Sequence, residues 1–257
     1  MYLDVVDLRA FYAEHLGEVA ASLIGARLRG HWPSLGGERL LGMGYATPYL
    51  PALARGAERA IAFMPAVQGV VNWPPEGPNA AALVADDALP LPDATVDRVV
   101  VIHSLEMSES PREQLREIWR VLAPGGRILL VVPNRRGIWA WAEKTPFGYG
   151  RPFTRSQLTA LLRDTMFSPL GWSEALAAPP IRRRPWLRSG RTWEQVGTAL
   201  WGAFAGVIIV EATKQLYQGV PARSRGRLRP AFRPALMPPP ASARKAVGTT
   251  IMPPAGR

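Results

Sequence analysis

The sequence predicts an α/β fold, a mostly parallel seven-stranded sheet with helices on both faces. Residues 97–102 (DRVVVI) and 127–132 (RILLVV) are almost unbroken apolar runs, typical of parallel strands buried on both faces. Between them, residues 110–122 carry apolar side chains at helical spacing, and the PGG turn at 124–126 ends that helix. A strand, a crossover helix and a strand in this order form a right-handed βαβ unit.

The N-terminal segment precedes this sheet. Residues 5–29 have the pattern of an amphipathic helix or two short ones, which Gly30 and Pro33 end. We expect one apolar face, made of Phe11, His15, Val19, Leu23 and Ala26.

Five further strands are expected from short apolar or β-branched runs, at residues 39–41, 60–63, 83–85, 170–175 and 206–212. Helices are expected at residues 48–55, 155–164 (with Thr154 as the N-cap) and 193–204. The remaining connections are loops, at residues 70–79 with Trp73 as an anchor, at 138–152, and at the basic stretch 181–191.

The turns around residues 97–102 carry a family resemblance. Asp86, Leu89-Pro90-Leu91, Asp97 and the RVLAPGG turn at 120–126 occur in the order found in class I S-adenosylmethionine (SAM)-dependent methyltransferases. The chain resembles the small-molecule, type 11-like branch over roughly residues 37–132. The resemblance implies a Rossmann-like sandwich and methyl transfer from SAM. We expect a helical cap at 1–36, the methyltransferase-like domain at 37–219, and a tail at 220–257.

The resemblance also implies a set of cofactor-binding residues. The family pattern acidic-x-Gly-x-Gly-x-Gly is met at Gly42 and Gly44, with Leu40 at the acidic position. Where the family has a carboxylate for the ribose hydroxyls, this chain has Met64-Pro65. One of two aspartates is expected to accept from the adenine amine. The full set is Gly42, Gly44, Tyr45, Ala46, Met64, Pro65, Asp86, Asp87 and His103.

His103 and Glu106 are the catalytic candidates. His103 follows the fourth strand, at the floor of the cofactor cleft in this family, where it would stack near the methyl donor or act as a general base; Glu106 is the alternative base. Methyl transfer depends mainly on orientation, so no base is strictly required. The alternative for His103 is a buried structural residue.

Substrate-binding residues are expected at the exit of the fifth strand, with the N-terminal helix as a lid. An arginine there suits a carboxylate or phosphate, and aromatic rings suit a flat acceptor; alternatively the tryptophans only pack the loop onto the sheet. The candidates are Asn134, Arg135, Trp139 and Tyr149.

Composition excludes some classes of site. The chain has no Cys and only three His without metal-ligand spacing, so we expect no disulfide and no metal site. The longest apolar stretch, 196–210, is shorter than the roughly 20 residues of a membrane span. With no signal-like N-terminal pattern, we expect a cytoplasmic protein.

The formal net charge of +11 is concentrated in the tail. Residues 220–257 hold eight Lys or Arg, eight Pro and no Asp or Glu, which predicts a basic, disordered segment. Such a tail, like the RRRPW run at 182–186, can contact nucleic acid or an anionic membrane. Alternatively, it reflects a general bias toward Arg, of which the chain has 28 against three Lys.

Three functions are consistent with this sequence. The first is a SAM-dependent methyltransferase with an unidentified acceptor, for which a small molecule is favoured. The second is a noncatalytic binding or regulatory protein on a decayed methyltransferase scaffold, since two cofactor carboxylates are absent. The third, a nicotinamide-nucleotide binder, rests on residues 42–47 alone, which loosely resemble a Rossmann turn.

Overall fold

The structure is a computed structural model that describes residues 3–142, 144–180 and 204–217. All of them belong to one compact unit. The expected basic loop at 181–191, the tail, and almost all of the expected helix at 193–204 lie outside the described residues.

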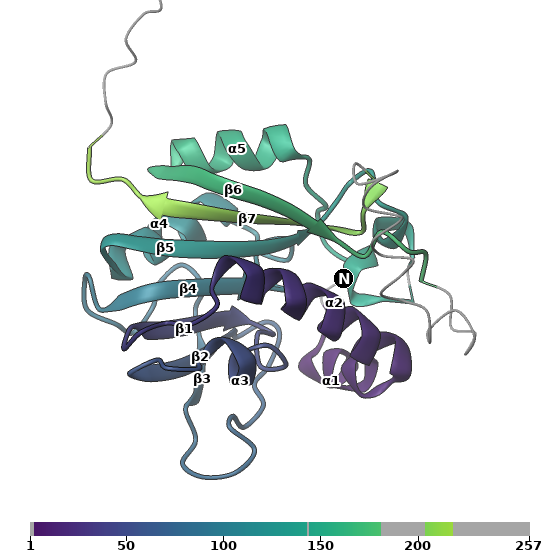
Figure 1. Ribbon diagram of the computed structural model, residues 1–257, viewed down its shortest axis with the longest axis horizontal. Coiled ribbons are helices and arrows are strands. Elements are labelled where there is room, and N and C mark those ends of the chain that lie inside the picture. The colour runs from purple at the N-terminus through teal and green to yellow at the C-terminus, as the bar shows by residue number, and fades with distance from the viewer. Residues whose placement is uncertain (1–2, 143, 181–203, 218–257) are drawn as a thin grey trace, which may run out of the picture. The chain divides into compact units, whose positions relative to one another are not determined.

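Seven strands form a single sheet, in the order β3-β2-β1-β4-β5-β7-β6 (Figure 1). Strand β7 is antiparallel to both of its neighbours, and the other pairings are parallel. This confirms the predicted fold class. The elements are α1 (Val5–Ala13), α2 (His15–His31), β1 (Arg39–Gly44), α3 (Leu50–Leu53), β2 (Arg59–Pro65), β3 (Ala81–Val84), β4 (Val96–Ile102), α4 (Pro111–Val121), β5 (Leu122–Pro133), the 3-10 turns η1 (Ile138–Trp141) and η2 (Pro146–Gly148), α5 (Arg155–Asp164), β6 (Phe167–Ala175) and β7 (Val207–Lys214).

Several strands are longer than predicted, among them β2 (Arg59–Pro65) and β6 (Phe167–Ala175), and two of the extensions change a turn. Strand β1 continues through Gly42 to Gly44, because its backbone pairs with Val100 and Ile102 of β4 as far as that residue. Strand β5 takes in the PGG turn at 124–126, and Leu122 pairs with Val96. The turn after β1 therefore begins at Gly44, two residues later than the sequence suggested.

The N-terminal segment forms two helices, one of the two predicted alternatives. Glu14 between them has an extended backbone (φ −82°, ψ 154°), which interrupts the helical phase. The predicted common face is consequently wrong beyond Phe11, since His15 is exposed. Helix α2 instead buries a face made of Leu16, Ala20, Ile24 and Leu28.

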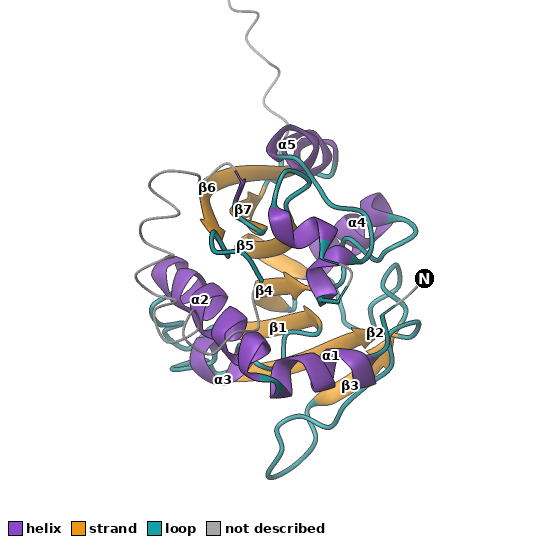
Figure 2. Ribbon diagram, turned by 90° about the vertical axis from the view of Figure 1, so that its right-hand side faces the viewer, coloured by secondary structure: helices purple, strands orange, loops and turns teal. Residues whose placement is uncertain are grey.

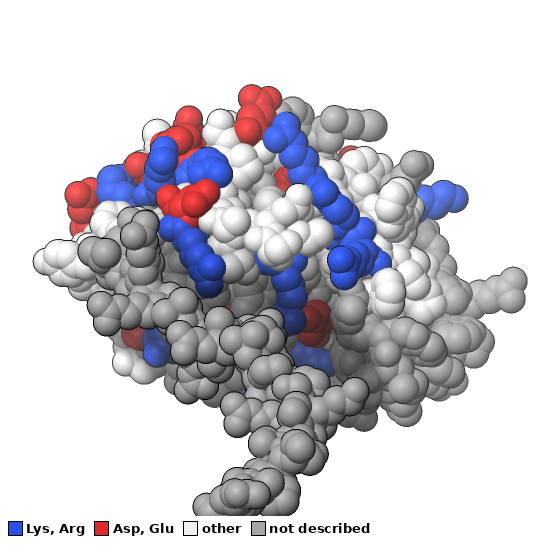
Figure 3. All heavy atoms as spheres, turned by 90° about the horizontal axis from the view of Figure 1, so that it is seen from above, with Lys and Arg blue, Asp and Glu red and all other residues white. Residues whose placement is uncertain are grey.

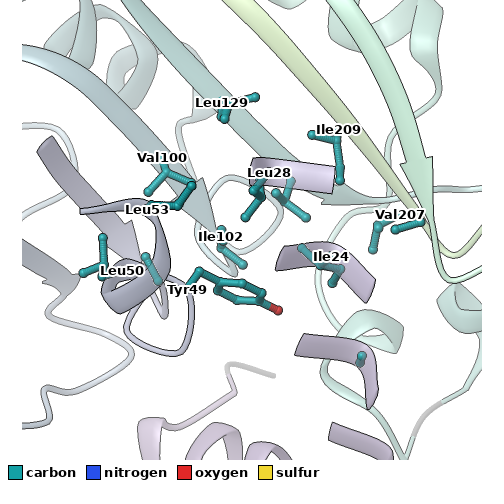
Figure 4. Close-up of a cluster of buried hydrophobic side chains, with 14 of the residues drawn as sticks. Ile24, Leu28, Tyr49, Leu50, Leu53, Val100, Ile102, Leu129, Val207 and Ile209 are labelled. Atoms are coloured by element: carbon teal, nitrogen blue, oxygen red, sulfur yellow. The ribbon is translucent and has the colours of Figure 1, made fainter. Parts of the chain in front are cut away.

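The core lies on both sides of the sheet. Val100 and Ile102 of β4 point toward α2 and α3, into the cluster shown in Figure 4. The alternate residues Val99 and Val101 point to the opposite face, where α4 and α5 cover them (Figure 2). This alternation explains why β4 is apolar without interruption.

The motif that carried the family resemblance is a hydrogen-bonded clamp. The guanidinium of Arg120 donates to the carbonyl oxygens of Leu89 (3.0 Å) and Leu91 (2.8 Å). It also pairs with Asp93 (2.8 Å) and with Glu117 of its own helix (2.8 Å). The LPLPD turn and the RVL helix end are thus held to each other, which makes this motif a structural device.

The remaining described elements agree with the sequence. Thr154 caps α5 through a capping box with Gln157. On the face shown in Figure 3, described Lys and Arg side chains are interspersed with Asp and Glu, and Arg155 of α5 pairs with Glu174 of β6 (3.1 Å). Within the described ranges, no helix is long and apolar enough to cross a membrane.

Candidate functional site

The carboxyl ends of β1, β2 and β4 meet at one edge of the sheet, where ligands bind in open α/β folds. Gly44 ends β1 in the left-handed region (φ +73°), and a Cβ there would lie 2.3 Å from the Ile102 carbonyl oxygen. Only glycine therefore allows β1 and β4 to end this close together. His103 follows β4 and also has a positive φ, 54°, which is uncommon for a residue with a side chain.

Helix α1 lies across this edge (Figure 2). Leu3, Val5 and Leu8 are buried in one cluster with Tyr45 of the glycine turn and Met64 of β2. The Val5 amide also donates to the Gln68 carbonyl oxygen, at 2.8 Å. The N-terminal segment thus fills the space above the ends of β1 and β2.

A polar cluster lies beneath α1. The Tyr12 hydroxyl is 2.8 Å from the Tyr49 hydroxyl and 2.8 Å from Nε2 of His103. On the other side of the imidazole, Nδ1 is 3.5 Å from Oε1 of Glu106. The His103 and Glu106 residues are only 1% and 2% exposed, so an acid–base pair is held almost completely away from water.

Several buried atoms of this cluster have no hydrogen-bond partner among the described residues. They are Nδ1 of His103, both carboxylate oxygens of Glu106 and Oε1 of Gln68. The amide nitrogen of Gln68 does have a partner, because it donates to the His103 carbonyl oxygen at 2.7 Å. Unpaired buried polar atoms are costly and rare in folded proteins, so several together indicate a binding or catalytic site.

Aromatic rings surround the Tyr12 hydroxyl. The Tyr12 ring is stacked on Tyr45, with centroids 5.5 Å apart and an interplanar angle of 25°. His103 contacts Phe147 of the long loop, with centroids 4.9 Å apart. Burial, together with the neighbouring Tyr49, raises the pKa of Tyr12 well above its usual value; burial likewise raises that of Tyr45. Both phenols therefore stay protonated at neutral pH.

A small cavity of about 10 Å³ remains at the ends of β2 and β4, about the room that a single water needs. Pro65, Gln68, Asp86 and His103 are among its lining residues. Asp87 is exposed and does not line it. The geometry therefore distinguishes the two aspartates that the sequence left equivalent.

The predicted cofactor residues lie together at this edge. Tyr45, Ala46 and Met64 are buried there, with Met64 under the α1 cluster and Pro65 at the cavity. Gly42, the first glycine of the predicted pattern, lies within β1. Leu40 lies in the core beneath α2.

The predicted substrate residues do not gather around the cavity. Asn134 donates to the Ala205 carbonyl oxygen, and Trp139 donates to that of Ala178, so both fasten the loop after β5. Arg135 lines a separate cleft of about 460 Å³ between α4 and α5. Of the four, Tyr149 alone packs against the apolar cluster that Leu3, Val5 and Leu8 form with Tyr45 and Met64. A substrate role for these residues stays a prediction.

Three residues of the cluster were missed by sequence reasoning, namely Tyr12, Tyr49 and Gln68. Tyr12 belongs to a helix more than 90 positions from His103, and no local spacing connects the two. Gln68 lies in a loop after β2, where amide side chains carry no specific signal. Among the described residues, no group of three His, Asp or Glu is arranged to hold a metal ion.

Comparison with known proteins agrees with this geometry. A sequence model of the methyltransferase domain matches residues 41–130. No curated protein matches the chain.

Solved structures match with low identity. A SAM-dependent methyltransferase from Thermotoga maritima, described as a possible histamine N-methyltransferase, is 16% identical with a TM-score of 0.56, covering 82% of this chain and 96% of its own. A SAM-dependent methyltransferase from Mesorhizobium loti is 15% identical with a TM-score of 0.54, covering 74% and 96%. The cyclase SpnF is 20% identical with a TM-score of 0.50, covering 76% and 80%.

The matches to solved structures concern the fold alone. The match to the methyltransferase domain model covers the region from β1 to β5, which contains most residues of the cluster under α1. The predicted resemblance is confirmed: residues 41–130 match the methyltransferase domain model, and the chain has the fold of class I SAM-dependent methyltransferases.

Proposed function

We propose that this protein is a SAM-dependent methyltransferase acting on a small molecule, and that α1 covers its cleft in the absence of ligands. One observation carries the proposal. At the carboxyl edge of a methyltransferase domain, Gln68, His103 and Glu106 present buried polar atoms without partners in the described part of the chain. A ligand that satisfied them would be bound with specificity.

The residues at this edge fit SAM in their chemistry. Asp86 offers a carboxylate to the adenine amine from the wall of the cavity. Oε1 of Gln68 is an unpaired acceptor close to the end of β2, where the ribose hydroxyls are held in this family. Gln68 thereby replaces the carboxylate that Met64-Pro65 does not provide, and Met64 offers an apolar surface.

SAM supplies an activated methyl group on a sulfonium when it is bound. The protein contributes position and a dry environment. Glu106 favours the tautomer of His103 with its proton on Nδ1, and this leaves Nε2 free to accept a proton from an acceptor. Phe147, which does not belong to α1, packs against the imidazole with ring centroids 4.9 Å apart and helps to keep water from this atom.

The cleft admits SAM only after α1 moves, because the cavity of about 10 Å³ is far smaller than a nucleoside. Displacement exposes Leu3, Val5 and Leu8, at a cost of roughly 1.5–3 kcal/mol for each side chain. The closed state therefore dominates without ligand, and it reduces the apparent affinity for SAM.

The same observation favours a second candidate, a noncatalytic protein on a methyltransferase scaffold. In that case α1 has replaced the cofactor permanently, which agrees with the missing carboxylate at the end of β2. The two candidates differ in one measurable property, the binding of SAM.

Isothermal titration calorimetry of the full chain with SAM and S-adenosylhomocysteine tests the proposal. We expect dissociation constants below about 100 μM, or roughly −5.5 kcal/mol. Asp86→Ala should weaken binding by about tenfold or more, the effect of one charge-assisted hydrogen bond. The matched control Asp87→Ala removes an exposed carboxylate outside the cavity and should bind as the wild type does. A folded wild type that binds neither ligand would establish the noncatalytic alternative.

A further inference from the structure

The hydroxyl of Tyr12 occupies the position in which an acceptor would be deprotonated. It is 2.8 Å from Nε2 of His103, the atom that the Glu106 carboxylate leaves available as a base. It is also 2.8 Å from the hydroxyl of Tyr49, which can donate to the same oxygen. A phenol from the protein's own lid thus makes the two contacts that a reacting hydroxyl needs.

We propose that the methyl acceptor is a phenol, and that Tyr12 is its resident stand-in while α1 is closed. This inference rests on the proposed function, because it names the acceptor of the same site. When α1 leaves, it removes the Tyr12 ring together with Phe11, whose ring packs edge-on against it at 5.2 Å, but the other ring partners of Tyr12 belong to other segments. Tyr45, Tyr49, His103 and Phe147 remain around a slot that has held a phenol.

The slot selects for a flat ring. Tyr45 lies under the Tyr12 ring in a stacked arrangement, and Tyr49 contacts its edge, with centroids 6.0 Å apart and planes at 87°. His103 meets the same ring at 5.8 Å and 64°. One stacking face and two edge contacts are the geometry that aromatic rings prefer, and an aliphatic alcohol cannot reproduce it.

The hydrogen bonds select for an oxygen with one removable proton. Nε2 of His103 accepts that proton, while the Tyr49 hydroxyl donates to the oxygen's lone pair. An ammonium group has no lone pair for Tyr49, and a carboxylate has no proton for His103.

The reaction balances with these groups. The phenol oxygen forms a bond to the methyl carbon as the methyl–sulfur bond breaks, and the phenolic proton passes to Nε2 of His103. The products are an aryl methyl ether, S-adenosylhomocysteine and a proton that is then lost to solvent.

Ligand binding to a cavity variant tests the recognition of the hydroxyl without any turnover. Tyr12→Ala in the full chain opens the slot, and thermal unfolding is then measured with 4-methylphenol or with toluene, which lacks only the hydroxyl. We expect 4-methylphenol to bind Tyr12→Ala about tenfold more tightly than toluene does, because toluene leaves His103 and Tyr49 unpaired. The matched control Phe11→Ala opens a neighbouring cavity against Phe147 and should not distinguish the two compounds. Equal binding of both compounds to Tyr12→Ala would overturn the proposal.

Methyl transfer tests the chemistry. With labelled SAM, Tyr12→Ala should convert 4-methylphenol to its methyl ether, and 4-methylaniline should react at least about tenfold more slowly. Adding His103→Gln should lower the rate by about 10²- to 10⁴-fold, the usual contribution of a general base. Preference for the aniline, or SAM binding without ether formation, would overturn the phenol assignment. Failure to bind SAM would refute the proposed function instead, and the comparison with toluene would still decide whether this is a phenol site.

Discussion

Two polar regions of this domain lie close in sequence and differ in how their atoms are satisfied. In the Arg120 clamp, the guanidinium has four partners, and Glu117 also accepts from the Leu89 amide at 3.0 Å. In the cluster under α1, His103, Glu106 and Gln68 keep buried atoms without partners among the described residues. The clamp is complete without a ligand, whereas the cluster is not.

This difference separates stability from function. Satisfied polar groups at the surface stabilise a fold, and unsatisfied buried groups destabilise it unless a ligand completes them. We therefore expect changes in the clamp to affect unfolding and not binding. Changes in the cluster should affect binding or turnover, with little effect on the free energy of unfolding.

Gly44→Ala should have the largest effect. Its Cβ would lie 2.3 Å from the Ile102 carbonyl oxygen at a positive φ, so overpacking adds to backbone strain, and we expect a loss of about 3–5 kcal/mol in the free energy of unfolding. Gly125→Ala is the matched control. It has a similar φ of +75° but no atom within 4 Å of the added Cβ, so about 1–2 kcal/mol should be lost. Equal losses in urea denaturation would show that the β1–β4 approach is not tight.

Arg120→Ala should lower the free energy of unfolding by about 2 kcal/mol. It leaves the carbonyl oxygens of Leu89 and Leu91 without their donor, and the side chain's partial exposure limits the loss. The affinity for S-adenosylhomocysteine, measured by calorimetry below the unfolding transition, should not change. A weakened affinity would place the clamp within the binding machinery.

Glu106→Gln should change the free energy of unfolding by less than about 1 kcal/mol, because the carboxylate oxygens have no hydrogen-bond partner in the described chain and only a 3.5 Å contact with Nδ1 of His103. The same change should slow methyl transfer, since His103 loses the carboxylate that favours its tautomer. Denaturation and turnover of one preparation measure both. A destabilised variant would mean that Glu106 is structural.

The Arg39–Asp97 pair at the start of β1 should give a smaller effect that depends on pH. Hydrogen bonds from the Arg39 side chain and backbone hold the pKa of Asp97 below its usual value. A lowered pKa in the folded state adds stability above the carboxylate's unfolded pKa of about 3.9, and this is lost as the pH falls through the folded value. Asp97→Asn should therefore lower the free energy of unfolding by about 1 kcal/mol at pH 7 and by less near pH 3. An equal difference at both pH values would contradict this reading of the pair.

The fold could be predicted because its signals are local. Residues 97–102 and 127–132 are apolar on both faces, and the turns between them fix the order of the strands. The end of β1 was predicted too early because glycine suggests a turn, whereas pairing with β4 continues to Gly44. The α2 face was predicted wrongly because the break at Glu14 could not be seen in the periodicity.

The site was predictable only in part. His103, Glu106 and one of Asp86 and Asp87 follow strand ends and were predicted from the family resemblance, and their roles stay predictions. Tyr12 and Gln68 meet them only through the tertiary fold, so nothing in the local sequence marks them. The Trp139 ring, which looked suited to a substrate, packs against Gly206 instead.

The central claim is that α1 leaves the cleft when a ligand enters, and the reactivity of a single thiol tests it directly. The chain has no Cys, so Leu8→Cys places one thiol on the buried side of α1, and Val6→Cys places one on its exposed side as the control. Saturating S-adenosylhomocysteine should speed labelling of the Leu8→Cys variant by a thiol reagent by about tenfold or more, and leave the Val6→Cys variant unchanged. Bound S-adenosylhomocysteine with an equally protected thiol at position 8 would contradict the account.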